Sequence, residues 1–269
     1  MNSSQSPATL PRLTGVLHLP PLPGSPRFAG DLGAIVRQVD AEARALQTAG
    51  FDAVMVENFG DAPFFPGRVD AVTVSAMTAC ALAARMAAPG LELGINVLRN
   101  DAETALAIAA CTGASLVRVN VHSGARVTDQ GVVEGRAHAT VRLRRALDAG
   151  NVRLLCDVDV KHSAPLAARP IEEEAEEVSA RGLADAVLVT GTGTGRGVAT
   201  ADLERVVRAV HVPVLVASGS TPESLPALRA AGAHGVIVGT ALRKTGRAGD
   251  PVDADSARAY AEAFRKVFG

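Results

Sequence analysis

The sequence predicts an α/β protein with a single domain, a closed (β/α)8 barrel. Short apolar runs rich in valine alternate eight times with longer amphipathic stretches. This is the pattern of parallel strands buried on both faces, with a helix after each strand. The chain has 269 residues, close to the about 250 typical of one such barrel. A doubly wound open sheet is the rival fold, but it would show fewer strands and a dinucleotide-type glycine turn after the first strand.

The expected elements follow one another in strict alternation. The strands are expected at residues 15–19, 53–56, 91–97, 116–121, 154–160, 186–189, 214–217 and 235–238. The helices are expected at residues 31–49, 70–88, 101–111, 134–149, 171–181, 201–210, 222–231 and 254–267. Three helix ends carry a capping glycine and a tight turn into the next strand, at Gly50, Gly182 and Gly232. We expect residues 1–13 to form a flexible tail and residues 14–269 to form the barrel.

Composition and charge exclude several classes of protein. The net charge is −1, with acids and bases mixed along the chain, so no basic stripe favours a nucleic-acid partner. The first residues lack the features of a signal peptide, and no apolar run reaches the about 20 residues of a membrane span. The three cysteines are isolated in apolar runs, as expected for buried thiols in a reducing compartment. We therefore expect a cytoplasmic protein, and barrels of this kind often form homo-oligomers.

The first two strands end in residues that carry acid–base chemistry. His18 interrupts an apolar strand just before a loop with four prolines in seven residues, where the alternative is a structural histidine beside a rigid wall. Glu57 directly ends the second strand and is a candidate base or metal ligand. The phenylalanines that follow Glu57 form an apolar wall of the pocket or pack the loop down.

Polar residues recur at every second position of the next strands. Two trios are spaced in this way: Arg118, Asn120 and His122, then Asp157, Asp159 and Lys161. In a strand this spacing places each trio on one face. Unpaired charges are costly to bury against helices, so these faces should point into the barrel and toward its mouth, together with Asn96. The alternative is an interior salt-bridge layer between Arg118 and the two aspartates.

The later strand-to-helix loops are rich in glycine and hydroxyl residues. The loop after the fourth strand, with Asp129, suits a lid, a substrate contact or a surface turn. The loops after strands six to eight contain Thr190, Gly191, Gly193, Ser218, Gly219, Ser220, Gly239 and Thr240. Phosphate-binding barrels use the loops after strands seven and eight, with a helix N-terminus. Ser220 or Thr221 with Pro222 is typical of such a helix start. We expect a phosphate or carboxylate cup there; the alternative is a set of tight turns.

These motifs together resemble the BtpA/SgcQ family. The resemblance runs from about Gly15 to the end of the chain and rests on the segments at residues 18–24, 57–63, 94–101, 118–124, 128–131, 157–162, 190–193 and 239–240. It implies a barrel of the ribulose-phosphate-binding type. Some members carry the label of photosystem I biogenesis factor, and others look like products of sugar-utilisation operons. Ribulose-phosphate epimerases use an aspartate at the end of strand seven, where this chain has Ala217 and Ser218, which puts their two-aspartate reaction in doubt.

The leading hypothesis is an isomerase, epimerase or lyase acting on a phosphorylated sugar or a related metabolite. Gly219, Ser220, Gly239 and Thr240 would hold the phosphate, lined by Gly191, Gly193 and Ser218. The expected substrate contacts are Asn96, Asn120, His122, Asp129 and Thr190. The expected catalytic residues are Asp157 or Asp159 as the general base, Lys161 as acid, enolate stabiliser or Schiff-base amine, Arg118 as a neutralising charge, and Glu57 and His18 as secondary groups.

Two alternatives stand beside this hypothesis. In one variant a Mg²⁺ or Mn²⁺ ion is held by Glu57, Asp157 and Asp159 with His18 or His122, because oxygen-rich ligation suits these cations. In the other, the chain is a non-catalytic assembly or biogenesis factor that keeps the barrel and its ligand cup. A shared fold alone does not decide between them.

Overall fold

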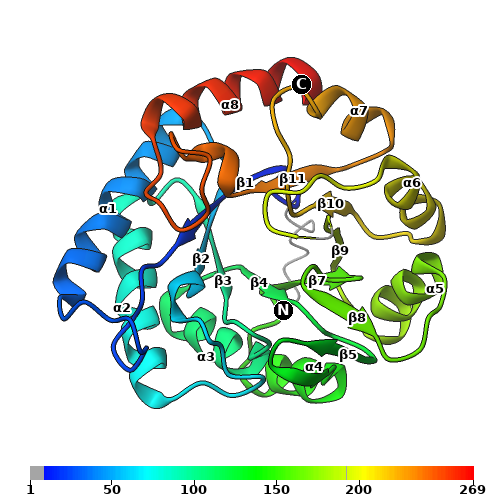
Figure 1. Cartoon of the computed structure of the whole chain (residues 1–269), viewed down its shortest axis with the longest axis horizontal. Helices are drawn as coiled ribbons and strands as arrows, with labels where there is room; N and C mark the ends of the chain where they lie inside the picture. The colour runs from blue at the N-terminus through cyan, green and yellow to red at the C-terminus, as the bar shows by residue number, and fades with distance from the viewer. Residues whose placement is uncertain (1–8, 192) are drawn as a thin grey trace, which may run out of the picture.

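The chain folds into the closed parallel barrel that the sequence predicts (Figure 1). The computed structural model describes residues 9–191 and 193–269. Around the barrel lie β1 (Leu13–His18), β2 (Ala53–Glu57), β3 (Glu92–Asn96), β4 (Leu116–Val119), β7 (Arg153–Val158), β9 (Ala186–Val189), β10 (Val214–Val216) and β11 (Gly235–Val238). Every neighbouring pair is parallel, and β1 pairs with β11 to close the ring.

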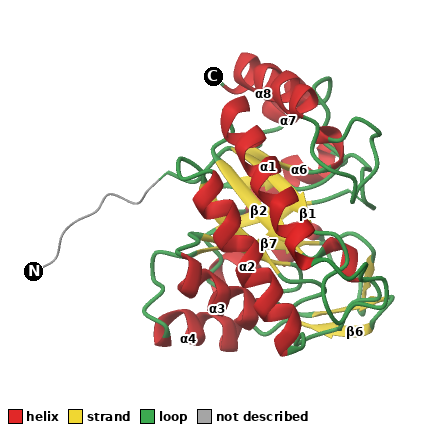
Figure 2. Cartoon of the chain, turned by 90° about the vertical axis from the view of Figure 1, so that its left-hand side faces the viewer, coloured by secondary structure: helices red, strands yellow, loops and turns green. Residues whose placement is uncertain are grey.

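Helices surround the strands on the outside (Figures 1 and 2). They are α1 (Leu32–Ala49), α2 (Ala71–Ala87), α3 (Ala102–Thr112), α4 (Ala137–Ala146), α5 (Ile171–Glu176), α6 (Thr200–Ala209), α7 (Leu225–Ala230) and α8 (Ala254–Phe268). At α1 the Asp31 side chain accepts from the Ala34 amide, and Gly50 ends the helix in the left-handed region, with φ 85°. Within the described residues, no helix is both long enough and apolar enough to span a membrane.

The barrel begins earlier than the sequence analysis expects. Leu10 is buried in the interior cluster together with Val16 and Met55, and β1 starts at Leu13. The Arg12 guanidinium donates to the Phe268 carbonyl at the end of the chain. Residues 10–13 are therefore part of the barrel rather than of a flexible tail, because Leu10 fills the amino-terminal end of the interior. Residues 1–8 of the expected tail lie outside the described residues.

The start of α7 also differs from the expectation. The helix begins at Leu225, after a turn in which the Ser224 hydroxyl accepts from the Thr221 amide at 2.9 Å. The Ser220 hydroxyl accepts from the Tyr260 hydroxyl at 2.7 Å instead of capping a helix. The expected N-cap at Ser220 or Thr221 is therefore wrong, since the turn at residues 221–224 separates the strand end from the helix.

A small antiparallel sheet was not anticipated. β5 (Ala125–Thr128) pairs with β6 (Gly131–Glu134) and with β8 (Ser163–Pro165). The first two strands form a hairpin in the loop after β4, and the third comes from the loop after β7. Figure 2 places β6 at the edge of the molecule, away from the barrel strands. The loop expected as a lid or a surface turn is thus an ordered hairpin.

Candidate active site at the carboxyl end of the barrel

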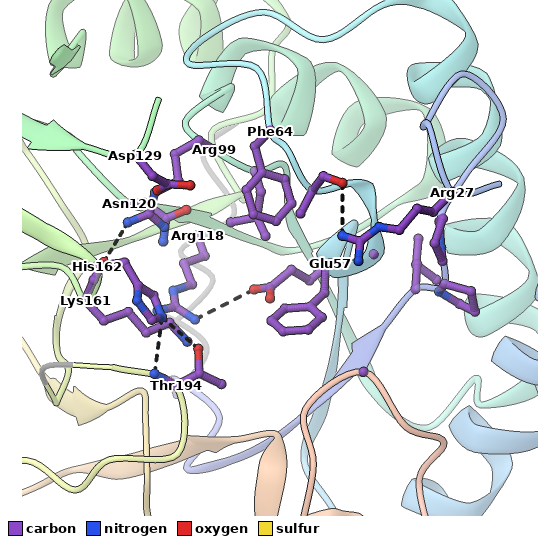
Figure 3. A pocket seen from close by; sticks show the side chains of 18 residues that line it. Arg27, Glu57, Phe64, Arg99, Arg118, Asn120, Asp129, Lys161, His162 and Thr194 are labelled. Carbon is purple, nitrogen blue, oxygen red and sulfur yellow. Dashed lines mark hydrogen bonds and ion pairs between the residues drawn. The ribbon is translucent and has the colours of Figure 1, made fainter. Parts of the chain in front are cut away.

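A cavity of about 740 Å³ opens at the carboxyl ends of the barrel strands. Figure 3 shows Lys161, His162, Arg118, Asn120 and Arg99 close together on one side of the cavity and Arg27 on the other. This volume lies within the range of about 300–1,000 Å³ found for small-molecule sites. The position is the one where barrels of this type place their chemistry.

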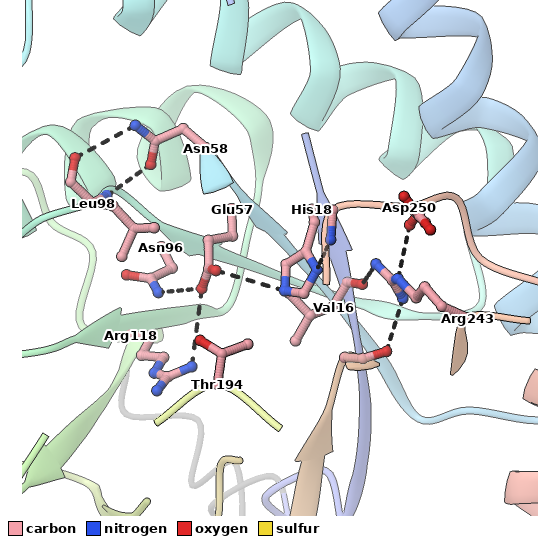
Figure 4. Close-up of polar contacts among 12 residues, drawn as sticks. Val16, His18, Glu57, Asn58, Asn96, Leu98, Arg118, Thr194, Arg243 and Asp250 are labelled. Carbon is pink, nitrogen blue, oxygen red and sulfur yellow. Dashed lines mark hydrogen bonds and ion pairs between the residues drawn. The ribbon is translucent and has the colours of Figure 1, made fainter. Parts of the chain in front are cut away.

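Glu57 lies at the floor of the cavity, at the end of β2, and is buried. Its Oε2 accepts from Asn96 Nδ2 at 2.6 Å and lies 3.9 Å from Arg118 Nη1 (Figure 4). Its Oε1 lies 3.8 Å from His18 Nε2. Burial raises the pKa of Glu57, but the basic groups around it, His18, Arg118 and Lys161, and the Asn96 hydrogen bond lower it by more. Glu57 is therefore an ionised carboxylate at neutral pH, as a general base must be.

His18 lies beside Glu57 and is neutral at physiological pH. Its ring stacks on Phe59 with 4.4 Å between the centroids. Burial, foremost, lowers its pKa from 6.5 to about 4. The Gly249 amide donates to Nδ1 at 3.2 Å, so the neutral ring carries its proton on Nε2, the nitrogen that faces Glu57.

Asp157 holds Arg118 in place instead of facing the cavity. Its carboxylate accepts from the Arg118 guanidinium at 3.1–3.2 Å and from Asn120 Nδ2 at 2.6 Å. Asp157 is only 2% exposed and is not among the residues that line the cavity. Arg118 and Asn120 do line it, and the buried Oδ1 of Asn120 has no hydrogen-bond partner within the described residues. The expected interior salt bridge therefore forms between Arg118 and Asp157 alone, and the Arg118 guanidinium also faces the cavity.

Asp159 and His122 point away from the cavity, so the expectation that each trio shares one face is wrong for them. β7 ends at Val158, and Asp159 has φ 45°, in the left-handed region. Its carboxylate pairs with Arg126 near the outer edge of the barrel. His122 Nε2 lies 2.8 Å from the Gly182 carbonyl, in a buried position beyond the end of β4.

Lys161 is a half-buried ammonium on the cavity wall. Within the described residues its side chain makes no hydrogen bond or ion pair. Its main chain is fixed, because the amide donates to Thr190 Oγ1 at 3.1 Å and the carbonyl accepts from Arg99 Nη2 at 2.6 Å. Burial and the Arg118 charge lower the pKa of Lys161, and Glu57 and Asp157 oppose them. Thr190, expected as a substrate contact, thus positions this lysine.

Several cavity residues were not assigned from the sequence. They are Arg27, Arg99, His162 and Thr194, whereas Phe64 lies in the apolar wall that the sequence analysis expects as one alternative. Arg99 lies three residues after Asn96, the last residue of β3. Its position just beyond a strand end could have predicted it as a cavity residue. His162 Nε2 lies 2.9 Å from Thr194 Oγ1, which ties the loop after β7 to the loop after β9. Asp129, which was expected, also lines the cavity.

The expected phosphate residues surround a much smaller hollow of about 20 Å³ next to the cavity. Ser218, Gly219, Gly239 and Thr240 line it together with Thr194 and Gly195. A space of this size holds about one water molecule. Gly219 has φ 62°, and a Cβ atom there would lie 2.1 Å from the Arg196 carbonyl oxygen.

The segment at residues 193–197 therefore covers the hollow. A Cβ atom at Gly191 would also lie 2.1 Å from the Arg196 carbonyl oxygen. Gly193 belongs to the covering segment itself, and its carbonyl accepts from the Ser218 hydroxyl. Ser220 lies behind the hollow, bonded to Tyr260. The hollow as it stands is too small for a phosphate group.

The residues named for a divalent cation do not fit one. Asp157 is occupied by Arg118 and Asn120, and Asp159 and His122 lie elsewhere. The described residues contain no group of three histidine, cysteine, aspartate or glutamate side chains arranged to hold a metal. Arg118 and Lys161 also bring positive charge to Glu57, which opposes cation binding.

The fold and the site define a (β/α)8 barrel with a charged cavity at the carboxyl ends of its strands. The chain belongs to the BtpA family, whose model matches residues 10–266. It is 43% identical to the photosystem I biogenesis protein BtpA of Synechocystis sp. over 253 residues, which are 93% of this chain and 86% of that protein.

Solved structures share the architecture at low sequence identity. One is (S)-3-O-geranylgeranylglyceryl phosphate synthase from Thermoplasma acidophilum in complex with its substrate sn-glycerol-1-phosphate, with a TM-score of 0.60, 20% identity and coverage of 96% of this chain and 94% of that one. Another is 3-hexulose-6-phosphate synthase, with a TM-score of 0.59, 18% identity and coverage of 96% and 100%. At these identities the likeness establishes the fold alone.

Gly60 allows the loop after β2 to lie directly against the proline-rich loop after β1. A Cβ atom there would lie 2.4 Å from the Pro21 nitrogen and 2.8 Å from the Leu19 carbonyl oxygen. Gly60→Ala is therefore expected to lower the free energy of unfolding by about 1–3 kcal/mol, as overpacking does. Gly67→Ala on the same loop is the control, because no atom of the described residues lies within 4 Å of its Cβ position. Urea denaturation of both variants is the measurement, and equal stabilities would show that the two loops separate freely.

Proposed function

We propose that this barrel is an enzyme that acts on a phosphorylated small metabolite by moving a proton next to a carbonyl group, as an isomerase, epimerase or lyase does. The observation that carries the proposal is the floor of the cavity, where the Glu57 carboxylate lies beside Arg118 and Lys161. A base placed next to two positive charges is what enolate formation requires.

Each residue has a distinct part in this chemistry. Glu57 takes the proton, because it lines the cavity and neither Asp157 nor Asp159 does. Arg118 and Lys161 stabilise the negative charge that develops on the substrate oxygen. His18 offers the Nε2 proton of a neutral imidazole to Glu57 or to the substrate. Asp157 keeps Arg118 oriented.

An anionic substrate is supported by the charge of the cavity lining. Its basic side chains include Arg27, Arg99, Arg118 and Lys161, and its acidic side chains are Glu57 and Asp129. Cations in a partly desolvated site attract a phosphate more strongly than they would in water. The two structural neighbours are named for phosphorylated compounds, which is consistent with this class of substrate.

The second candidate is an assembly factor without turnover, favoured by the name of the Synechocystis relative. Such a protein would use the barrel surface and would need no ionised base facing a cavity. A pH-dependent turnover that Glu57→Gln abolishes would decide for the enzyme.

Thermal unfolding with ligand pairs tests the proposal. Phosphorylated metabolites are expected to raise the Tm and their dephosphorylated parents are not; at about 100 times its Kd a ligand adds about 2.7 kcal/mol. Lys161→Met is expected to weaken the shift, and Lys244→Met, at an exposed position, to leave it unchanged. If no phosphorylated compound of a broad panel raises the Tm, the enzyme proposal fails and the assembly factor takes its place.

The reactivity of Lys161 gives an independent prediction. The chain has three lysines, Lys161, Lys244 and Lys266, so amine labelling maps cleanly by peptide mass spectrometry. Because its pKa lies below the ordinary value, Lys161 loses its proton at a lower pH than a lysine in a model peptide. Its labelling rate should therefore rise and level off at a lower pH than that of the peptide. A profile that coincides with the peptide's would contradict the desolvated, cationic surroundings described here.

A further inference from the structure

The cavity has two walls of different chemistry. The polar wall comes from the loops after β3, β4, β7 and β9 and includes Arg99, Asn120, Asp129 and Lys161. The opposite wall comes mainly from the loops after β1 and β2; it carries Arg27 at its rim, and its other side chains are those of Leu19, Pro20, Pro21, Phe59, Ala62 and Phe64. Figure 3 shows Phe64 on the side of the cavity across from Lys161 and His162.

The apolar wall is held open by contacts behind it. The Leu19 carbonyl accepts from the Gly60 amide at 2.9 Å, and Asp61 Oδ1 accepts from the Leu22 amide at 2.8 Å. Arg27 Nη2 donates to the Ala62 carbonyl at 3.0 Å at the outer rim. Prolines fix the backbone between these contacts. The two loops are thus bound to one another, and Phe59 and Phe64 stay half-buried rather than collapsing into the core.

We propose that the substrate is a phosphate ester that carries an aromatic or heteroaromatic ring, with the ring on the apolar wall and the phosphate on the polar wall. This inference rests on the proposed function, because it assumes the phosphate. Phe64 is the main ring contact, since one face of Phe59 is already covered by His18.

The chemistry of the apolar wall argues against a plain sugar phosphate. A sugar has hydroxyl groups on nearly every carbon, and the carbon side chains of this wall offer them no partner. A flat ring loses no hydrogen bonds there and gains contact with Phe64 and the proline rings.

The size of the cavity supports the same conclusion. Its volume of about 740 Å³ lies in the upper part of the range of about 300–1,000 Å³ for small-molecule sites. A phosphate on the polar wall would leave the space in front of Phe64 unfilled unless the ligand extended toward it.

The experiment compares matched probes by titration calorimetry on the full-length protein. AMP and phenyl phosphate carry both groups, ribose 5-phosphate carries the phosphate alone, and adenosine carries the ring alone. At least one of the two ring-bearing phosphates is expected to bind about 10-fold or more tightly than ribose 5-phosphate and adenosine, given what stacking contributes. Phe64→Ala should weaken that probe about 10-fold and leave ribose 5-phosphate unchanged.

Phe65→Ala is the matched control, because Phe65 is adjacent in sequence, 47% exposed and absent from the cavity lining. It should change no affinity. If ribose 5-phosphate binds as tightly as the ring-bearing phosphates, or Phe64→Ala affects none of the probes, the ring inference is overturned while the phosphate proposal stands. If adenosine binds as tightly as AMP, the phosphate proposal fails. If no phosphorylated probe binds, both fail.

Discussion

Arg118→Met is expected to lower the free energy of unfolding by about 3–5 kcal/mol, the cost of removing one partner from a buried ion pair. The guanidinium contacts Asp157 through two nitrogens at 3.1–3.2 Å, and both side chains are at most 2% exposed. Without Arg118, Asp157 would keep only the Asn120 hydrogen bond, and Glu57 would lose a neighbouring charge. Chemical denaturation of wild type and variant at neutral pH is the measurement.

Two further variants isolate the cause. Arg44→Met removes an exposed ion pair with Asp40 and should change stability by less than about 1 kcal/mol. Asp157→Asn combined with Arg118→Met should recover part of the loss, since Asp157 is then no longer an uncompensated buried charge. If Arg118→Met lowered the free energy of unfolding by less than about 1 kcal/mol, solvent would have to reach Asp157. The charge of Asp157 would then not need Arg118 to compensate it.

The barrel was predictable because its signals are local. Each strand is a short valine-rich run between amphipathic stretches, and capping residues such as Asp31 and Gly50 mark where a helix begins and ends. The placement of Glu57 at the cavity followed from its position at a strand end, and that of Arg118 and Lys161 from the spacing of polar residues two apart. None of these inferences needed knowledge of contacts between distant residues.

The failures arose where a strand ends. Successive side chains point to opposite faces of the sheet only inside a strand. The strands β4 and β7 end at Val119 and Val158. Beyond those points Asp159 adopts a left-handed conformation and His122 turns to the Gly182 carbonyl. The sequence continues with alternating apolar and polar residues through both endings, so nothing in it marks the change.

The hairpin of β5 and β6 was missed for a related reason. Of its three valines only Val133 is buried, and Val127 and Val132 are 44% and 52% exposed. Its pairing with β8 joins loops that lie far apart in the sequence. A loop rich in glycine and polar residues gives no periodic signal for such a sheet.

Glu57→Gln is expected to reduce turnover about 10²–10⁴-fold, the contribution typical of a general base. Glutamine keeps an oxygen that can accept from Asn96, so the side chain should stay in place while it loses its basicity. Substrate binding should therefore change little and kcat should fall. The measurement uses the ligand class found by thermal unfolding and follows exchange of substrate C–H protons with deuterated water, which reports proton removal even without net product.

Asp129→Asn is the control, because Asp129 also lines the cavity but lies beside Arg99 and Asn120 on the polar wall (Figure 3). It should alter affinity for the anionic ligand more than the rate of exchange. Comparing Glu57→Gln with Asp129→Asn in one assay thus distinguishes an effect on the exchange rate from an effect on ligand affinity. Undiminished exchange in Glu57→Gln, with exchange lost in Asp129→Asn, would transfer the role of base to Asp129 and move the reacting carbon from the floor of the cavity to its polar wall.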